Sequence, residues 1–227
     1  MKMFNSIRAD LILLFLFGLI SSLPGQVAEW ENQLKKDPDN RELLLNLGKH
    51  YHNFGGTKEN KDAVRKAEKY LFKLLEMEPE NCIALVYYGS VLTMKARDAF
   101  FPWDKLKWVK KGISRMDEAV TLESDNPEVR FIRGVNSATM PKMMSRLSVA
   151  LEDFVHIEKL NREKPLNMTK KFWLPYYYNY GLALYKNKEF EAAKEKYLKT
   201  IDVDPESDYA GYARRDLKKI EETNHED

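Results

Sequence analysis

Apolar and small residues recur at helical spacing in the segment from Tyr176 to Ser207, which reads YYYNYGLALYKNKEFEAAKEKYLKTIDVDPES. Its tyrosines and leucines follow the i, i+3, i+4, i+7 spacing of one helix face. Gly181 and Ala193 stand where two paired helices would approach closely, because their small side chains do not separate the backbones. Pro205 predicts the end of the second helix, since proline cannot continue the hydrogen-bond ladder. The pattern predicts an antiparallel helix pair.

The same frame recurs three times upstream in a longer form. Each copy has a glycine ten residues after the position that closes the preceding helix; the glycines are Gly48, Gly89 and Gly134, and the closing residues are Pro38, Pro79 and Ser124. A constant interval of this kind is typical of internal repeats. We therefore expect four helix pairs, a lone helix before them and a terminal helix after them; the pairs are expected at about 41–81, 82–126, 127–163 and 174–207, and the terminal helix at 208–223.

From about residue 26 to residue 227 the sequence resembles the tetratricopeptide-repeat (TPR) family. Tyr180-Gly181, Ala193, Tyr197 and Pro205 stand at the spacings of the 34-residue repeat of that family. The resemblance implies an all-α fold, a right-handed helical solenoid of antiparallel helix pairs. It also implies a concave inner face that is lined by the first helices and binds partner peptides or proteins. It implies no reaction.

The repeats depart from the family spacing by insertions. The interval from the glycine to the closing position is 24 residues in the fourth pair, 31 in the first and 35 in the second. The extra residues lie between the helices of a pair, as GGTKEN, KARDAFFPWDKLKW and, in the third pair, TMPKMMSRL. A further insertion, NREKPLNMTKKF, contains Asn167 in a pattern that fits a glycosylation acceptor. Loops on a rigid scaffold often carry function, so these insertions are candidate sites.

The insertion KARDAFFPWDKLKW contains four aromatic residues beside charged ones. Pro102 predicts the turn between the two helices, and the second helix is expected to open at residue 103 or 104. Trp108 is expected to pack, because a lengthened helix needs apolar contacts of its own. The aromatic residues at the turn are predicted to bind a partner, with packing on neighbouring loops as the alternative; they are Phe100, Phe101 and Trp103.

The inner face predicted from the family's inward positions is mixed and mostly apolar. TPR proteins that grip chaperone tails need several basic and amide donors spread over three repeats, because carboxylates require charge-assisted hydrogen bonds. Asn46 and Lys49 have no such continuation in the next repeats, so that role is not expected. Candidate partner-binding residues on this face are Lys49, His52, Tyr178, Asn179 and Tyr185. The alternative is that the array's own terminal helix fills the inner positions.

The first 25 residues predict a secretory signal peptide. Lys2 and Arg8 precede the apolar run LILLFLFGLI, which small and turn-forming residues follow. The run is shorter than the roughly 20 apolar residues of a spanning helix, so an uncleaved anchor is the alternative. Cleavage after Ser22, Gly25 or Ala28 would fit. The mature chain is expected to have no stable membrane span and to be exported, periplasmic or secreted, and the resemblance favours a bacterial source.

Charge and motifs argue against nucleic-acid binding and catalysis. The formal net charge is +2, and the basic residues alternate with acidic ones instead of forming a stripe. Cys82 is the only cysteine and is expected to be a small buried hydrophobe. His50 and His52 are two residues apart, whereas a zinc pair on one helix needs a spacing of four. We expect no catalytic residue, no metal ligand and no cofactor.

These features predict an exported, non-enzymatic TPR adaptor. Its protein or peptide partner, of unknown identity, would bind the concave face or the inserted loops, with aromatic side chains as anchors. One alternative is a structural subunit of a cell-envelope or transporter-associated assembly, with apolar faces that stay buried. Another is an enzyme whose site is built from the loops. The oligomeric state is left open.

Overall fold

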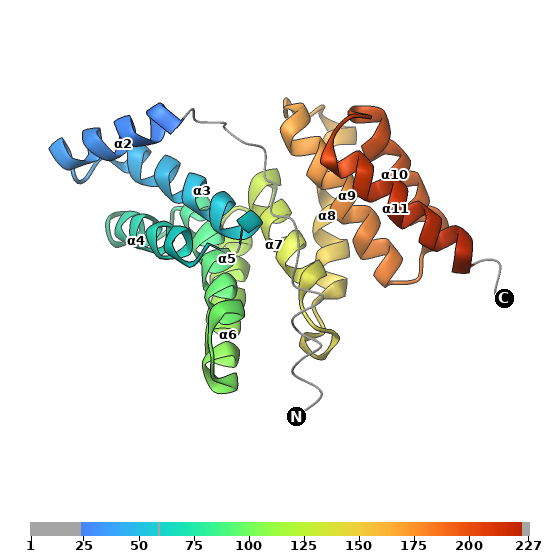
Figure 1. The fold of residues 1–227 in the computed structure, drawn as a ribbon, viewed down its shortest axis with the longest axis horizontal. Helices are drawn as coiled ribbons and strands as arrows, with labels where there is room; N and C mark the ends of the chain where they lie inside the picture. Colours follow the sequence, from blue (N-terminus) through green and yellow to red (C-terminus); the bar gives the residue numbers. More distant parts are fainter. Residues whose placement is uncertain (1–23, 59, 224–227) are drawn as a thin grey trace. The chain divides into compact units, whose positions relative to one another are not determined.

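A computed structural model describes residues 24–58 and 60–223 of the 227-residue chain. All regular structure in these residues is helical, so the predicted all-α class is confirmed. One compact unit ends at Asn136, and the other begins at Ser137. The elements, shown in Figure 1, are α2 (Pro24–Lys36), α3 (Arg41–Lys58), α4 (Lys61–Met77), α5 (Cys82–Asp98), α6 (Pro102–Leu122), α7 (Pro127–Thr139), η1 (Lys142–Met144), α8 (Leu147–Glu163), α9 (Lys170–Lys186), α10 (Phe190–Val203) and α11 (Asp208–Thr223).

The predicted signal peptide falls almost entirely on residues 1–23, which lie outside the described part. Pro24 and Gly25 already belong to α2. Within the described residues, no helix combines the length and the apolar character that crossing a membrane requires. Export and its cleavage site stay predictions.

The same type of asparagine turn precedes three of the helices in the first unit. In each copy the side-chain Nδ2 donates to a carboxylate three residues earlier, at 3.0, 2.7 and 2.7 Å. The Oδ1 of the same side chain accepts a backbone N–H from the first turn of the following helix. The turns are centred on Asn40, Asn81 and Asn126 and start α3, α5 and α7. A shared cap thus opens three successive repeats in the same way.

Helix pairing follows the small residues that the sequence pattern singled out. A Cβ built on Gly89 would lie 2.7 Å from the carbonyl oxygen of Gly112, so α5 and α6 touch backbone to backbone. In the second unit, a Cβ built on Gly181 would meet the ring of Tyr197 at 2.7 Å and the carbonyl oxygen of Ala193 at 3.3 Å. The crossing of α9 and α10 therefore uses the residues that the repeat pattern predicted.

The core of the second unit is aromatic. The Phe154 ring lies 5.9 Å from that of Tyr176 and 5.4 Å from that of Tyr180. The Tyr176 hydroxyl donates to the carbonyl oxygen of Phe154 at 2.8 Å, which joins α9 to α8 inside the core. Tyr197 of α10 is fully buried nearby in the same unit. Large ring areas removed from water hold this unit together.

The helix boundaries differ from the expected ones at two places. α6 begins at Pro102, one residue earlier than expected, because proline suits the first helical position, where its missing N–H costs nothing. α9 begins at Lys170, four residues before the expected start, and includes Pro175. The connecting segment before α9 contains Asn167, which is exposed. Its glycosylation stays a prediction.

Candidate functional site

The inner face of the first unit is held by a charged contact between α3 and α7. Lys49 Nζ lies 2.6 Å from Glu128 Oε1, and the Tyr87 hydroxyl donates to the same oxygen at 2.8 Å. The ammonium also stands 5.2 Å from the centre of the Tyr87 ring. Burial and the neighbouring Glu128 raise the pKa of Tyr87 well above its usual range, so this hydroxyl stays protonated. Lys49 is therefore held in place, and 24% of its side chain is exposed to solvent.

His52 lies behind Lys49 and is fully buried. Its Nδ1 is 2.9 Å from Asn53 Oδ1, and its Nε2 is 2.8 Å from Ser90 Oγ. Because Asn53 Oδ1 can only accept, the proton belongs on Nδ1, and Ser90 donates to Nε2. Asn136 Nδ2 then donates to Ser90 Oγ at 3.1 Å. The polar chain joins α3, α5 and α7 through the interior.

Burial decides what His52 can do. It lowers the pKa of the imidazole to about 4, opposed in part by the hydrogen bond to Asn53 and aided by Lys49. A neutral ring with both nitrogens occupied can neither shuttle protons near neutral pH nor ligate a metal. Within the described residues, no group of three or more histidine, cysteine, aspartate or glutamate side chains is placed to hold a metal ion. The network fixes helix positions.

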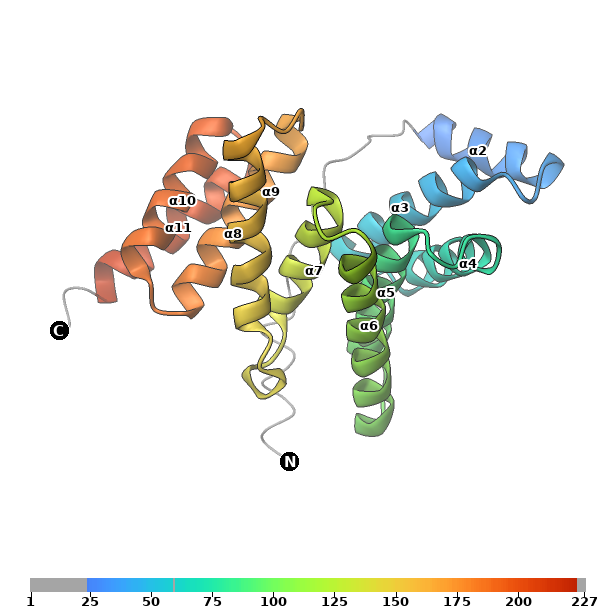
Figure 2. The same cartoon turned by 180° about the vertical axis from the view of Figure 1, so that it is seen from behind.

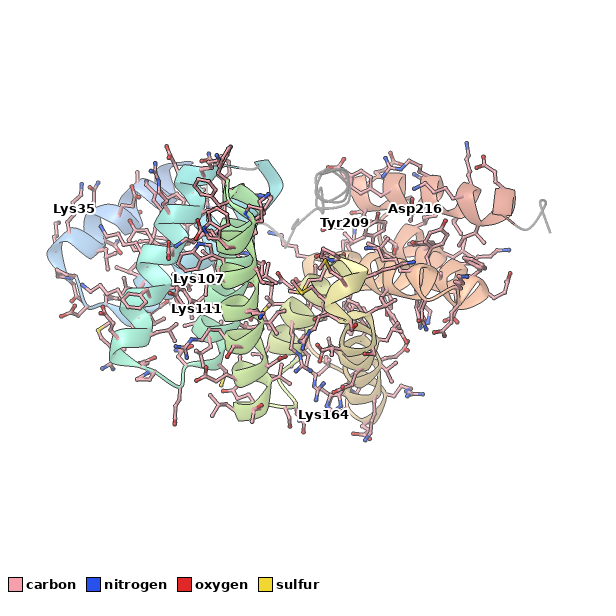
Figure 3. All side chains as sticks on the ribbon, turned by 90° about the horizontal axis from the view of Figure 1, so that it is seen from below. Lys35, Lys107, Lys111, Lys164, Tyr209 and Asp216 are labelled. Carbon is pink, nitrogen blue, oxygen red and sulfur yellow. The ribbon has the colours of Figure 1, made fainter. Side chains whose placement is uncertain are left out.

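The inner-face residues of the second unit are mostly covered by its last helix. The Tyr178 hydroxyl donates to Asp216 Oδ2 on α11 at 3.0 Å, and its ring stands 5.5 Å from that of Tyr209. Tyr209 and Asp216 are labelled on α11 in Figure 3. Within this unit, α11 thus fills the position in the way that the terminal-helix alternative expected.

Asn179 and Tyr185 complete that face. Asn179 is buried and donates to the Pro175 carbonyl at 2.7 Å. Tyr185 is half-buried against Phe190, with ring centres 5.6 Å apart. Of the five predicted inner-face residues, Lys49 and Tyr185 keep an accessible surface, whereas His52, Tyr178 and Asn179 have almost none.

The turn between α5 and α6 presents its aromatic side chains to solvent. Phe100 is 88% exposed, Trp103 is 65% exposed and Phe101 is 45% exposed. Phe101 stacks on Trp103 with ring centres 4.6 Å apart, and Phe100 meets Phe101 edge to face at 5.0 Å. Leu106, one turn into α6, is also exposed. We call Phe100, Phe101, Trp103 and Leu106 the aromatic tip.

Trp108 differs from the tip residues because it lies against α5. Lys95 Nζ stands 3.9 Å from the centre of its ring and 2.5 Å from Glu68 Oε1, which links α4, α5 and α6. The ring is half-buried, so the prediction that Trp108 packs is met by a cation over its face and not by an apolar core. Cys82 is buried, and burial raises its thiol pKa to about 11, as an inert cysteine requires.

The structure brings together residues that the sequence patterns did not connect. Asn136 completes the His52 chain from a helix 84 positions further on, and its only sequence signal was its place in α7. Leu106 joins the tip because it lies three residues after Trp103 on one helix face. The partner-binding roles of the predicted residues stay predictions.

Comparison with known proteins supports the fold. No protein-family model matches the chain, and no curated protein matches it. A solved thermophilic TPR protein from Thermus thermophilus is similar over 95% of this chain and 97% of its own, with 14% identity and a TM-score of 0.63. The structure of MamA is similar over 80% of this chain and 88% of the MamA chain, with 19% identity and a TM-score of 0.49.

A third similar structure is YrrB, described as a TPR protein with an unusual peptide-binding site. It covers 86% of this chain and 85% of its own at 21% identity, with a TM-score of 0.46. The match to the Thermus protein spans nearly the whole of both chains. With the helical repeats and the small-residue crossings described above, it shows that this chain has the fold of tetratricopeptide-repeat proteins.

Proposed function

We propose that the chain is an exported, non-enzymatic TPR adaptor that binds a protein or peptide partner. The observation that carries the proposal is the repeat fold, which matches a TPR protein over nearly the whole chain. Solenoids of this kind offer extended surfaces made from successive repeats, and partners bind such surfaces. The buried hydrogen bonds among His52, Ser90 and Asn136 and the buried tyrosines hold the helices that form such a surface.

The partner contact is proposed at the open edge of the inner face in the first unit. Leu45, Asn46 and Lys49 lie along α3 and are partly exposed. Lys49 uses one donor on Glu128, and an ammonium carries three, so a carbonyl or carboxylate of a partner can still bind it. In the second unit, Tyr185 offers a half-exposed ring with a hydroxyl, a type of side chain that is common at interfaces.

Site-specific photo-crosslinking in the native host tests this contact. A photoreactive amino acid replaces Asn46 in one variant and Tyr185 in another. Matched controls carry it at Lys69 and Lys194, which are exposed on the second helices α4 and α10. A discrete protein adduct at the inner positions, absent at the control positions, supports the proposal. Adducts of equal strength at all four positions, or none at any, contradict it.

A structural subunit is the second candidate, favoured by apolar side chains that lie on the surface. Phe72, Val155 and Leu198 are large and exposed on α4, α8 and α10. An obligate subunit would keep such residues covered by a neighbour. Size-exclusion chromatography with light scattering separates the candidates, because a monodisperse monomer across a hundredfold dilution contradicts the subunit.

A further inference from the structure

The aromatic tip stands at the end of a long helical hairpin. α5 has 17 residues and α6 has 21, and the two helices are in backbone contact at Gly89 and Gly112. Beyond that crossing, each helix runs nine or ten further residues to the turn, or about 14 Å at the rise of an α-helix. Both views show this end of the hairpin projecting from the first unit, away from α2, α3 and α4 (Figures 1 and 2).

The aromatic tip lies in the turn between α5 and α6 and at the start of α6. Its rings contact one another; Phe100 and Trp103 remain largely in water, whereas Phe101 is about half exposed. Their stacking orders the cluster without burying it. An ordered, exposed apolar cluster of this kind marks a surface that is covered by something else.

Basic residues surround the tip. Residues 95–111 contain six lysines and arginines and two aspartates, whereas the rest of the chain contains 31 basic and 33 acidic residues. Lys105, Lys107, Lys110 and Lys111 form no ion pair with a carboxylate in the described part of the chain. Lys107 and Lys111 are labelled along α6 in Figure 3. The hairpin end therefore concentrates positive charge in a chain that is otherwise nearly balanced.

Along α6, the side chains of this region change from apolar near the tip to basic further along the helix. Trp103, Leu106, Lys107 and Lys110 fall at i, i+3, i+4 and i+7, so they share one face of the helix. Apolar groups come first from the tip, and lysines follow within about 10 Å. This is the depth over which apolar groups enter a lipid interface, while lysine ammonium groups reach back to the phosphate level.

We propose that the aromatic tip docks on a negatively charged lipid surface, inserting Phe100, Trp103 and Leu106 at the interface and placing Lys107 and Lys110 among anionic headgroups. A lipid surface suits the composition better than an acidic protein, because protein interfaces favour arginine and are depleted of lysine. Tryptophan, phenylalanine and lysine are typical of membrane-interface segments. The docking goes beyond the proposed adaptor function, which uses the inner face.

The test places an environment-sensitive fluorophore at the tip of the full chain through Phe100→Cys. Cys82 is buried with a raised thiol pKa, so the new thiol reacts selectively. Ser124→Cys, exposed at the opposite end of α6, carries the same fluorophore as a matched control. The probes are vesicles of pure phosphatidylcholine and vesicles with about 30% phosphatidylglycerol. Because the readout is local, vesicle attachment through another part of the chain does not mimic tip insertion.

We expect a blue shift and brighter emission at position 100 with the anionic vesicles only, and no change at position 124. Lys107→Gln and Lys110→Gln should each weaken this binding roughly fivefold at low salt. Trp103→Ser should weaken it at least tenfold, and half-molar salt should remove most of it. Melting curves by circular dichroism should be unchanged, since these side chains are exposed.

Three results would overturn the lipid proposal. One is an unchanged spectrum at position 100 with anionic vesicles. Another is an equal shift at positions 100 and 124, which would mean nonspecific adsorption. The third is a shift with polyglutamate but not with vesicles, which would assign the tip to an acidic protein surface. Each result leaves the crosslinking test of the inner face independent, so the two proposals can fail separately.

Discussion

The hairpins α5–α6 and α9–α10 share one type of crossing but differ in what lies beyond it. Both helix pairs approach through small residues, at Gly89 and Gly112 in one hairpin and at Gly181 and Ala193 in the other. After the crossing, α9 continues for five residues and α10 has three before it, whereas α5 and α6 each have nine or ten. The short turn is partly packed, through Tyr185 and Phe190. The long one ends in exposed aromatic residues.

The difference shows that packing and exposure are confined to different parts of the long hairpin. Residues at and behind the crossing pack against other helices, so their types are restricted. In front of it, Val91, Leu92 and Met94 of α5 are still buried, whereas the residues of the aromatic tip are exposed. The contact of Lys95 with Glu68 and Trp108 links this arm to α4. The tip aromatics are therefore not explained by packing, which favours a binding role for them.

At neutral pH, the largest effect is expected from adding a methyl group at the backbone contact. In Gly89→Ala and Gly112→Ala, the new Cβ would lie 2.7 and 2.6 Å from the opposite carbonyl oxygen. Neither backbone can yield without separating the helices, so each variant should lose about 2–3 kcal/mol of unfolding free energy. Urea denaturation measures the loss.

The matched variants for this prediction lie in the second unit. Gly181→Ala should lose less, because the ring of Tyr197 can shift where a carbonyl cannot. Gly211→Ala meets nothing within 4 Å and should gain about 0.5–1 kcal/mol from helix propensity. A loss at Gly181 equal to that at Gly89 would remove the proposed distinction between the two crossings.

The buried His52 of the first unit predicts that the free energy of unfolding depends on pH. The aromatic core of the second unit predicts no such dependence. The unfolded His52 binds a proton below about pH 6.5, whereas the folded one stays neutral down to about pH 4. The stabilisation by the neutral ring is complete above pH 6.5 and is lost as the pH falls towards 4, by about 1.4 kcal/mol per pH unit. Other groups contribute their own slopes, so the difference from His52→Gln is measured.

His52→Gln should flatten the curve between pH 6.5 and 4, because glutamine has no proton to gain there. The variant itself should be less stable at pH 7, since the contact with Ser90 is altered. Parallel curves for the two proteins would contradict the assignment of the pH dependence to this side chain.

A smaller effect separates two buried tyrosines of the second unit. Tyr176→Phe should cost about 1 kcal/mol, because its hydroxyl donates to the Phe154 carbonyl. Tyr197→Phe should be neutral or slightly stabilising, because its buried hydroxyl has no partner in the described residues. Thermal unfolding of both variants gives the comparison, and an equal loss would mean that Tyr197 finds a hydrogen bond in solution.

The smallest effect is expected at the aromatic tip. Phe101→Ser with Trp103→Ser should change the unfolding free energy by less than about 0.5 kcal/mol, since both side chains are exposed, Trp103 at 65% and Phe101 at 45%. The matched pair at the short turn, Tyr185→Ser with Phe190→Ser, should lose about 1 kcal/mol, because those rings are partly buried. Denaturant curves decide, and a large loss at the tip would identify it as a packing element.

Much of the fold could be predicted from the sequence because its determinants are local. Gly181, Ala193 and Pro205 specify their helix pair through spacing alone, and Pro102 marks the start of α6 within one residue. The asparagine turns at Asn40, Asn81 and Asn126 carry a further local signal, since each is followed by the helix that it caps.

The candidate site could be predicted only in part, because exposure depends on contacts between distant residues. His52 looked like a surface residue of a concave face, yet Ser90 and Asn136 enclose it from two other helices. Tyr178 likewise depends on α11 for its cover. At the tip, the sequence identified the aromatic residues but could not decide between packing and solvent. Only the position of the turn relative to neighbouring helices decides that.

The backbone contact between Gly89 and Gly112 has a consequence for how this chain can vary. Residues added in matched whole turns between the buried Ala96 and the exposed tip would lengthen the hairpin without displacing the buried residues of α5. The length of the hairpin and the packing of its core can therefore change independently. Each added helical turn would move the tip about 5.4 Å further out, while the repeat that carries it stays the same.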